Sequence, residues 1–300
     1  MAQGIGVRYT ESGARVLGLE RSDDGLRITG ITAGSPEESL EEFITNHDFP
    51  LEDTVVACGL CPGTFLSACM APEDDIDETK IQDHLRWEIE RKMLSDPAEY
   101  IIDYATAGLG FVFAGRRQLI SKMKGSLLSF VTDVEPVALY NGSEGCGEIG
   151  DGTVLLVSVE AEGISSVLVQ GGAITAMESF PIHEDDLCPV LAGLDSDGIQ
   201  GITHPAPDRL SEYVLESINR ITGLENDQRK VAPDNIVVAG GGVYIGELTD
   251  MIEKKSGIHI TVSDPLAQFS DDLQERFPDM ARMSAAFTTC YGLAARALEE

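Results

Sequence analysis

Positive charge is scarce in this sequence. It has 21 Lys and Arg against 51 Asp and Glu, which gives a formal net charge of −30 at pH 7. A surface with this excess repels nucleic-acid phosphates and anionic lipid headgroups, because neither releases counterions to a like-charged protein. Nucleic acid is therefore not an expected partner, and direct membrane insertion is not expected either.

Long apolar runs are also lacking. No eighteen consecutive residues are apolar, and the N-terminus has neither the basic start nor the apolar run of a secretory signal. These absences predict a cytoplasmic chain. Six cysteines in such a chain are expected to be buried small side chains instead of a disulfide framework. They are at positions 58, 61, 69, 146, 188 and 290.

Familiar catalytic motifs are missing as well. The five histidines form no H-E-x-x-H pattern and no serine lies in a G-x-S-x-G turn, so the common hydrolase classes have no support. Cys58 and Cys61 have the C-x-x-C spacing of thiol redox sites. Such pairs usually begin a helix, whereas this pair follows an expected strand. Buried packing is favoured, and a redox protein stays open as a third hypothesis.

The sequence does contain a recurring pattern of β-rich runs separated by turn residues. Three short strands are expected within residues 4–33 and three more within 153–182. The Gly-rich stretch 141–152 lies between them and predicts a boundary. The order of strands and helices fits two mixed sheets with helices on their faces. We therefore expect an α/β protein of two lobes, residues 1–150 and 151–300.

Helices are expected between these strands. The clearest covers 75–94, and its apolar residues recur every four positions. They are Ile81, Leu85, Ile89 and Met93. Another helix is expected over 208–222 and a last one over 283–298, while 129–141 is expected to be a strand that turns at Pro136.

The stretch "NIVVAGGGVYIGELTDMIEKKSGIHITVSDP", followed by "SAAFTTCYGLAARAL", resembles the adenosine-side segment of the actin, sugar kinase and Hsp70 superfamily. With "LRWEIERKMLSDPAEYIIDY" it is similar, in particular, to the PilM family of type IV pilus assembly proteins. The resemblance implies a two-lobed actin-like (ribonuclease H-like) fold. A small α+β subdomain is implied at about 73–132 in the first lobe, and a reduced insertion at 182–205 in the second.

The glycine corner after the strand at 235–239 has two interpretations. The resemblance implies a residual adenosine pocket formed by Gly240, Gly241, Gly242 and Tyr244. Glycines let a backbone approach a nucleoside closely, because no Cβ intervenes. The alternative is that these glycines only turn a strand tightly into a helix.

The first hairpin of each lobe binds phosphates through a D-x-G loop in the superfamily. Alignment with PilM places Arg8 at the first aspartate and Thr10 at its glycine, with Arg15 at the usual lysine. In the second hairpin Ser158 replaces the aspartate and Glu160 the glycine. Both carboxylates that would hold Mg²⁺ and orient water are lost. Degenerate phosphate loops, without catalysis or a cofactor, are therefore expected.

Glu160 adds negative charge where a triphosphate would bind, and two like charges about 4 Å apart in partly buried surroundings repel by roughly 4 kcal/mol. We expect Arg8 to pair with Glu160 across the cleft and lock the lobes together. The alternative is that both are solvated charges at strand ends. The fold class alone also permits an ATPase or small-molecule kinase that binds ATP with Mg²⁺.

The resemblance also implies partners. PilM binds the cytoplasmic tail of the membrane protein PilN in a groove between the first lobe and its inserted subdomain. The chain is therefore expected to be a cytoplasmic scaffold of a type IV pilus or type II secretion platform, held at the inner membrane by a PilN-like protein and coupled to a motor ATPase. Trp87, the only tryptophan, is a candidate anchor for such a peptide.

Overall fold

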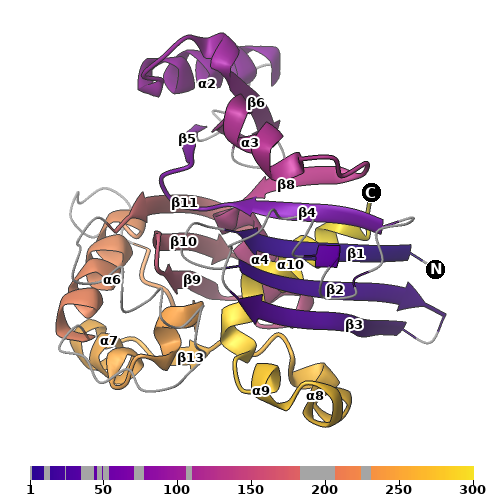
Figure 1. The fold of residues 1–300 in the computed structure, drawn as a ribbon. Helices are drawn as coiled ribbons and strands as arrows, with labels where there is room; N and C mark the ends of the chain where they lie inside the picture. Colours follow the sequence, from indigo (N-terminus) through magenta and orange to yellow (C-terminus); the bar gives the residue numbers. More distant parts are fainter. Residues whose placement is uncertain are drawn as a thin grey trace.

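The computed structural model describes residues 2–9, 14–23, 25–34, 44–45, 49, 54–70, 78–105, 110–182, 207–223 and 231–300. Two five-stranded sheets lie side by side, and a three-stranded sheet with α2 and α3 stands beyond them, at the top of Figure 1. No helix among the described residues is long and apolar enough to span a bilayer.

The first sheet has the strand order β3-β2-β1-β4-β8. Its bounds are Ala2–Tyr9 for β1, Ala14–Ser22 for β2, Gly25–Gly34 for β3, Thr54–Leu60 for β4 and Phe130–Val134 for β8. The first three strands form the antiparallel meander that the turn residues predict, while β4 and β8 add in parallel. This sheet is the core of the first lobe.

The second sheet repeats this plan in the order β11-β10-β9-β12-β13. Its bounds are Thr153–Glu160 for β9, Gly163–Gln170 for β10, Ala173–Pro181 for β11, Asn235–Ala239 for β12 and Ile260–Val262 for β13. Again three antiparallel strands are followed by two parallel ones. The recurrence predicted from the sequence is therefore present in the topology.

Two central helices join the sheets. They are α4 (Glu135–Gly145) and α10 (Thr288–Ala297). Although α10 comes from the second half of the chain, it packs on β1, β2 and β4 of the first sheet. Leu139 of α4, from the first half, is buried in an apolar cluster of second-sheet residues. Each half of the chain therefore supplies a helix to the other half's sheet.

The helix α4 differs from the expected strand over 129–141, of which only β8 is a strand. Pro136 lies in the first helical turn, where a proline is tolerated because its missing N–H has no intrahelical partner. The glycines of this helix meet α10: a Cβ on Gly142 would lie 2.3 Å from the carbonyl oxygen of Thr288. Close packing against α10 thus holds a Gly-rich stretch in a helix despite its low propensity.

The inserted subdomain is the three-stranded sheet β5-β7-β6 with two helices. Their bounds are Phe65–Met70 for β5, Glu78–Lys92 for α2, Tyr100–Ala105 for β6, Gly110–Arg116 for β7 and Arg117–Lys124 for α3. Leu85 and Ile89 of α2 are fully buried against this sheet, as the four-residue spacing predicts. The sheet begins before residue 73, and β8 belongs to the first lobe.

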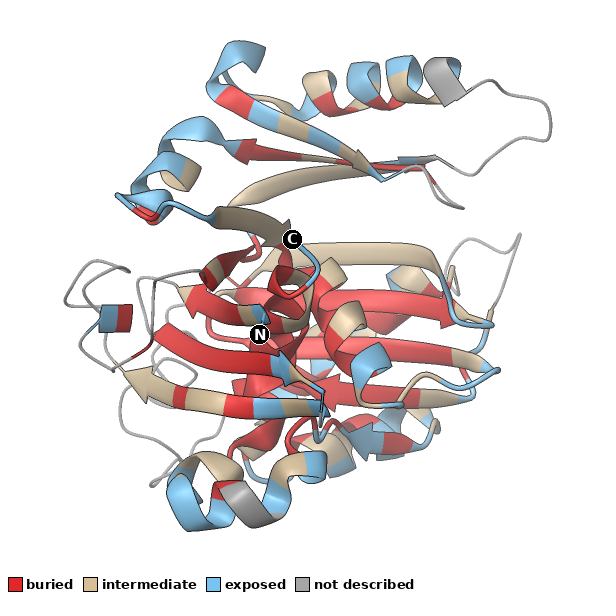
Figure 2. Ribbon diagram, turned by 90° about the vertical axis from the view of Figure 1, so that its right-hand side faces the viewer, coloured by how far each residue is buried: buried red, intermediate tan, exposed pale blue. Residues whose placement is uncertain are grey.

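The remaining elements surround the second sheet and the lower edge of the first. They are α6 (Pro207–Ile221), α7 (Leu248–Ser256), α8 (Ser270–Arg276), α9 (Pro278–Ala281) and the 3₁₀ helices η2 (Gly241–Tyr244), η3 (Ala267–Phe269) and η4 (Ser284–Phe287). The 3₁₀ helix η1 (Pro97–Glu99) belongs to the inserted subdomain, between α2 and β6. Figure 2 shows that buried residues concentrate in the two five-stranded sheets and the helices between them. Most of the expected insertion at 182–205 lies outside the described residues.

Candidate functional site

Two buried arginines lie side by side at the inner ends of the first hairpin. Arg8 of β1 faces Arg15 of β2 in the strand register, and each is only 1% exposed. Like charges directly opposite on neighbouring strands repel, and a buried cation needs a paired anion. Carboxylates must therefore meet these guanidinium groups inside the protein.

Glu160, the last residue of β9, supplies one of these carboxylates from the second lobe. Its Oε2 lies 2.5 Å from Arg15 Nη2, and its Oε1 lies 3.7 Å from Arg8 Nε. Glu160 is itself 1% exposed. The ion pair between Arg8 and Glu160 that the sequence predicted is present, and Arg15 is the nearer partner of the same carboxylate.

Two further carboxylates complete the group, and the sequence did not reveal either. Arg8 Nη2 forms an ion pair with Glu162 in the turn after β9, and Arg8 Nε lies 3.5 Å from Oε2 of Glu135, the first residue of α4. Ser158 Oγ donates to Glu135 Oε1 at 3.3 Å. We call Arg8, Arg15, Glu135, Glu160 and Glu162 the inter-lobe charge cluster.

Burial perturbs the acid–base behaviour of this cluster. It raises the pKa of Glu135 from 4.5 to about 7; Arg8 opposes that rise, and the charges of Glu160 and Glu162 reinforce it. Burial alone would lower the pKa of Arg8, but Glu160 and Glu162 raise it well above its ordinary value. Arg8 therefore stays charged, and Glu135 exchanges a proton near neutral pH.

The glycine corner packs directly against the end of β9. Gly240 has φ +88°, and a Cβ there would lie 2.5 Å from the carbonyl oxygen of Val159. The next residue, Gly241, donates its N–H to Glu160 Oε2 at 3.1 Å. The corner thus turns sharply, as the simpler interpretation of the glycines requires, and the amide of its second glycine binds the carboxylate of Glu160.

Tyr244 and the segment before α10 close the corner from the other side. The Tyr244 hydroxyl accepts a hydrogen bond from Ala285 N at 3.1 Å, and burial raises its pKa to about 12. Arg15 Nη1 donates to the carbonyl oxygen of Ala286. Tyr244 therefore helps to hold η4 in place, next to the corner that contains Gly240 and Gly242.

The residues of the cluster do not fit a magnesium triphosphate. A triphosphate needs free backbone amides and positive side chains, but the amide of Gly241 already binds Glu160 and both arginines already pair with carboxylates. Glu160 would repel the phosphates from within the same corner. A Mg²⁺ hydration shell also needs carboxylates that are not already paired with cations. The donors that a phosphate would need are thus already bound to carboxylates of the protein itself.

The other predicted site residues lie elsewhere. Thr10 is outside the described residues. Trp87 is on α2, the layer farthest from the two large sheets in Figures 1 and 2; its ring is 53% exposed and Arg91 stacks over it at 4.6 Å. Cys58 and Cys61 are buried, and burial raises the pKa of both thiols, opposite to what a redox thiolate needs.

Metal chemistry gains no support from the described ranges. Within them, no group of three His, Cys, Asp or Glu side chains is arranged to hold an ion.

Comparison with known proteins identifies the fold. No family model matches the chain, and no curated protein matches it in sequence. A PilM–PilN type IV pilus biogenesis complex contains a similar chain, with a TM-score of 0.70, 17% identity and 99% of each chain covered. A Bacteroides thetaiotaomicron protein with an actin-like ATPase fold and unknown function has a TM-score of 0.56 at 11% identity, covering 87% of this chain and 90% of that one.

A ROK family glucokinase from Streptomyces griseus, in complex with glucose and AMPPNP, has a TM-score of 0.51 at 12% identity, and the alignment covers 100% of each chain. At these identities the comparisons establish the fold alone. The chain has the two-lobed actin-like fold of the PilM type, as its sequence predicted.

Proposed function

We propose that this chain is a non-catalytic, actin-like scaffold of a type IV pilus or type II secretion assembly platform. It binds the cytoplasmic tail of a PilN-like membrane protein, works at the inner face of the membrane through that partner, and transmits the action of a motor ATPase. The observation that carries the proposal is the inter-lobe charge cluster, in which Glu160 binds Arg15 and the amide of Gly241.

The cluster supports a scaffold because it replaces a ligand by internal contacts. Actin-like enzymes close their two lobes around a nucleotide, whereas here Glu160 joins the lobes from within. Salt screens buried ion pairs much less than exposed ones. The lobes then keep one relative position whether or not nucleotide is present, which suits a protein that offers fixed surfaces to partners.

Nucleotide binding is tested by thermal unfolding with Mg-ATP. A ligand at a hundred times its Kd stabilises a protein by about 2.7 kcal/mol, and we expect no rise in Tm up to millimolar Mg-ATP. The glucokinase from Streptomyces griseus, whose structure contains AMPPNP, is the positive control. A clear rise in Tm for this chain would contradict the non-catalytic proposal.

Partner binding is tested separately with a synthetic peptide of the N-terminal cytoplasmic residues of a PilN-like protein from the same genome. We expect saturable binding in calorimetry, and a scrambled peptide is the control. Because Trp87 lies on the outer layer of the subdomain, Trp87→Ala tests whether that residue contributes. An unchanged Kd would remove Trp87 from the site without affecting the rest of the proposal.

A second candidate is an ATPase or small-molecule kinase of the same fold. The likeness to the glucokinase over the whole chain supports it, although the cluster does not fit its nucleotide. Release of phosphate from ATP by the purified chain, abolished by a change at Arg15 but not at exposed Arg91, would favour this candidate over the scaffold.

A further inference from the structure

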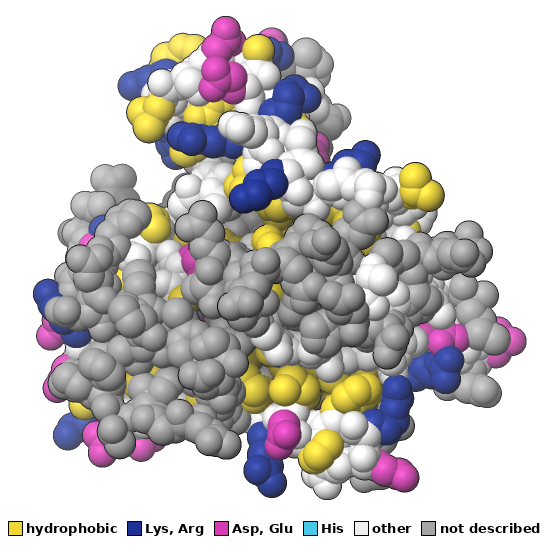
Figure 3. All heavy atoms as spheres, in the orientation of Figure 1, with side chains coloured by type: hydrophobic (Ala, Val, Ile, Leu, Met, Phe, Trp, Pro, Cys, Tyr) yellow, Lys and Arg dark blue, Asp and Glu magenta, His cyan; other side chains and the backbone are white. Residues whose placement is uncertain are grey.

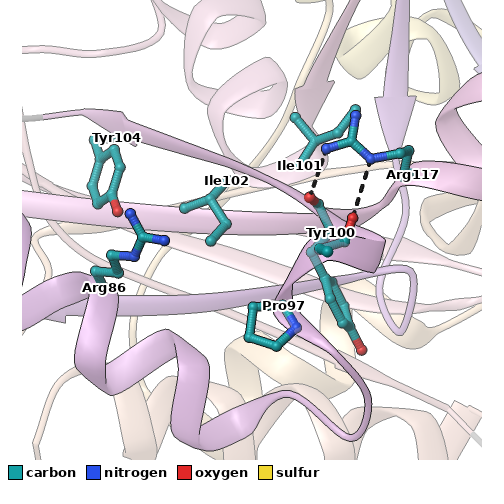
Figure 4. A pocket seen from close by; sticks show the side chains of 8 residues that line it. Arg86, Pro97, Tyr100, Ile101, Ile102, Tyr104 and Arg117 are labelled. Carbon is teal, nitrogen blue, oxygen red and sulfur yellow. Dashed lines mark hydrogen bonds between the residues drawn. The ribbon is translucent and has the colours of Figure 1, made fainter.

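We infer that the groove beside the outer edge of β6 is a second docking site, for an extended acidic peptide segment of a partner protein. We call it the edge groove; it has a volume of about 560 Å³, and the residues used below are Arg86, Tyr100, Ile101, Ile102, Tyr104 and Arg117. Figure 4 shows Arg86 and Tyr104 at one end, Arg117, Tyr100 and Ile101 at the other, and Ile102 between them.

The edge groove is separate from the junction between the subdomain and the first lobe. The inward side of the three-stranded sheet has Phe65 and Phe113, which pack against the apolar cluster of the first lobe. Tyr104 and Ile102 instead pack with the cluster under α2. The inference therefore does not depend on the proposed function: a PilN-like tail at the junction and an acidic segment at this edge can succeed or fail independently.

The backbone of β6 favours an extended ligand. In the described part of the chain β6 pairs only with β7, so its other edge faces outward. On that edge the Tyr104 N–H donates to its neighbour Asp103 Oδ1 at 2.8 Å, and the Tyr100 carbonyl accepts from Arg117 Nη2 at 3.3 Å. Side chains thus cap both ends of the edge, which limits uncontrolled strand pairing.

Ile102 lies between these two capped positions. Along an antiparallel strand, the backbone N–H and carbonyl groups of alternate residues point toward opposite neighbouring strands. Ile102 therefore directs its N–H and its carbonyl away from β7, as Tyr100 and Tyr104 do. One residue of an added strand can exchange two hydrogen bonds with it. The partly exposed Ile101, at 37%, offers apolar contact nearby.

Charge defines the ligand further. Acidic residues outnumber basic ones 51 to 21 in the chain, yet the lining of the edge groove includes two arginines and no carboxylate. Arg86 pairs with Glu90 on its own helix at 2.9 Å. Among the described residues, Arg117 donates only to neutral groups, the carbonyls of Ala98 and Tyr100, both at 3.3 Å. A ligand carboxylate would gain a charge-assisted bond there.

The length of the exposed edge also limits the ligand. Figure 3 shows Lys and Arg side chains on the subdomain, at the top of the molecule, with Asp and Glu side chains among them. The five residues from Tyr100 to Tyr104 are separated by four steps of extended chain, which span about 13 Å. A matching segment has about five residues, with a carboxylate at each end and β-branched side chains between them.

The test uses fluorescein-labelled peptides EVTVE and KVTVK with the full-length chain, measured by fluorescence anisotropy. We expect EVTVE to bind at least about tenfold more tightly than KVTVK, which corresponds to one good charge-assisted contact. Equal binding of the two peptides would overturn the inference. So would sedimentation showing that a second copy of the chain covers the groove, with EVTVE unable to bind.

Two pairs of variants test the geometry. Arg117→Ala should weaken EVTVE binding about tenfold, while Arg91→Ala, at the exposed arginine over Trp87, should leave it unchanged. Ile102→Pro removes the outward N–H that no sheet bond uses, and should weaken binding at least about fivefold relative to Ile102→Ala, which keeps it. Equal binding by the two Ile102 variants, both confirmed as folded by circular dichroism, would overturn strand pairing and with it the proposal.

Discussion

At Glu160 one carboxylate meets the arginines of the first lobe and an amide of the second. Its oxygens lie within ion-pair distance of Arg8 and Arg15, and it accepts the N–H of Gly241. Removing one partner of a buried ion pair usually costs more than the pair contributes, because the remaining charge stays buried. Glu160 is therefore the residue at which a single change tests the junction of the lobes most directly.

We expect Glu160→Gln to lower the free energy of unfolding by about 3–5 kcal/mol, since two buried guanidinium groups lose their shared anion. Urea unfolding followed by circular dichroism measures the change. Arg91→Ala is the control: Arg91 pairs with Glu88 on the surface of α2 and is 62% exposed, so its loss should cost under about 1 kcal/mol. A similar small cost for Glu160→Gln would show that the cluster does not hold the lobes.

Glu135 makes the stability depend on pH. Its pKa is about 7 in the folded protein and ordinarily 4.5, so between these values the folded state keeps a proton that the unfolded state has lost. The free energy of unfolding then falls as pH rises through this window. Asp133, whose pKa burial raises to about 6, acts in the same direction.

In Glu135→Gln the fall in unfolding free energy between pH 5 and pH 8 should be smaller than in the wild type. Urea unfolding at several pH values measures it, and Glu253→Gln, at an exposed position, is the control. A fall of the same size in Glu135→Gln and the wild type would contradict the assignment.

The sequence predicted part of the cluster for a physical reason. The two recurring hairpins have equivalent ends, and these ends hold Arg8 and Arg15 in the first lobe and Ser158 and Glu160 in the second. Once a resemblance identifies one hairpin, the recurrence identifies the matching positions of the other. Glu135 and Glu162 reach the cluster only through the packing of α4 and the turn after β9, which depends on distant contacts. The Glu-Pro pair at 135–136, acidic residue and first-turn proline, was the available signal for α4.

Among the elements, the meanders and α2 could be predicted because their apolar periods and turn residues agree. The helix α4 could not, because its sequence predicts a strand that turns at Pro136 and then a Gly-rich boundary, whereas its contact with α10 makes it helical. Leu293 and Ala297 of α10 and Ala57 of β4 share a fully buried cluster with Ala138 of α4. Tertiary packing thus overrides local propensity at this pair of helices.

Gly292→Ala should destabilise the protein by about 1–3 kcal/mol, the usual cost of overpacking a tight core. A Cβ there would lie 1.9 Å from the carbonyl oxygen of Ala138, so α4 and α10 would have to separate. Thermal unfolding measures the change. Gly246→Ala is the matched control, since a Cβ at that position meets nothing within 4 Å. Equal Tm values for the two variants would show that α4 and α10 can move apart without loss of stability.

At the scale of the whole molecule, the two lobes are not independent folding units. The first sheet is covered by α10, whose residues Cys290, Tyr291 and Ala294 pack with Leu17 and Leu19 of β2. The second sheet buries Leu139 of α4. A division of the chain at residue 150 therefore separates each sheet from a helix that covers it, although the strands themselves divide there.

A fragment of residues 1–150 should accordingly not fold alone, because the face of its sheet that α10 covers would be exposed. Co-expression with residues 151–300 should restore a soluble complex with the circular dichroism spectrum of the intact chain. A cooperative thermal transition in the isolated 1–150 fragment would contradict this expectation.

The exchange of helices also sets the timing of folding during synthesis. A ribosome adds about 5–20 residues per second, so α10, which begins 266 residues after the end of β2, emerges roughly 13–53 s after the hairpin of β1 and β2 has left the exit tunnel. During that interval the nascent first sheet has one uncovered apolar face. Chaperones that hold nascent chains would then bind the first half of the protein more than the second half. The second sheet does not wait for its helix, because α4 is synthesised before the strands that it covers.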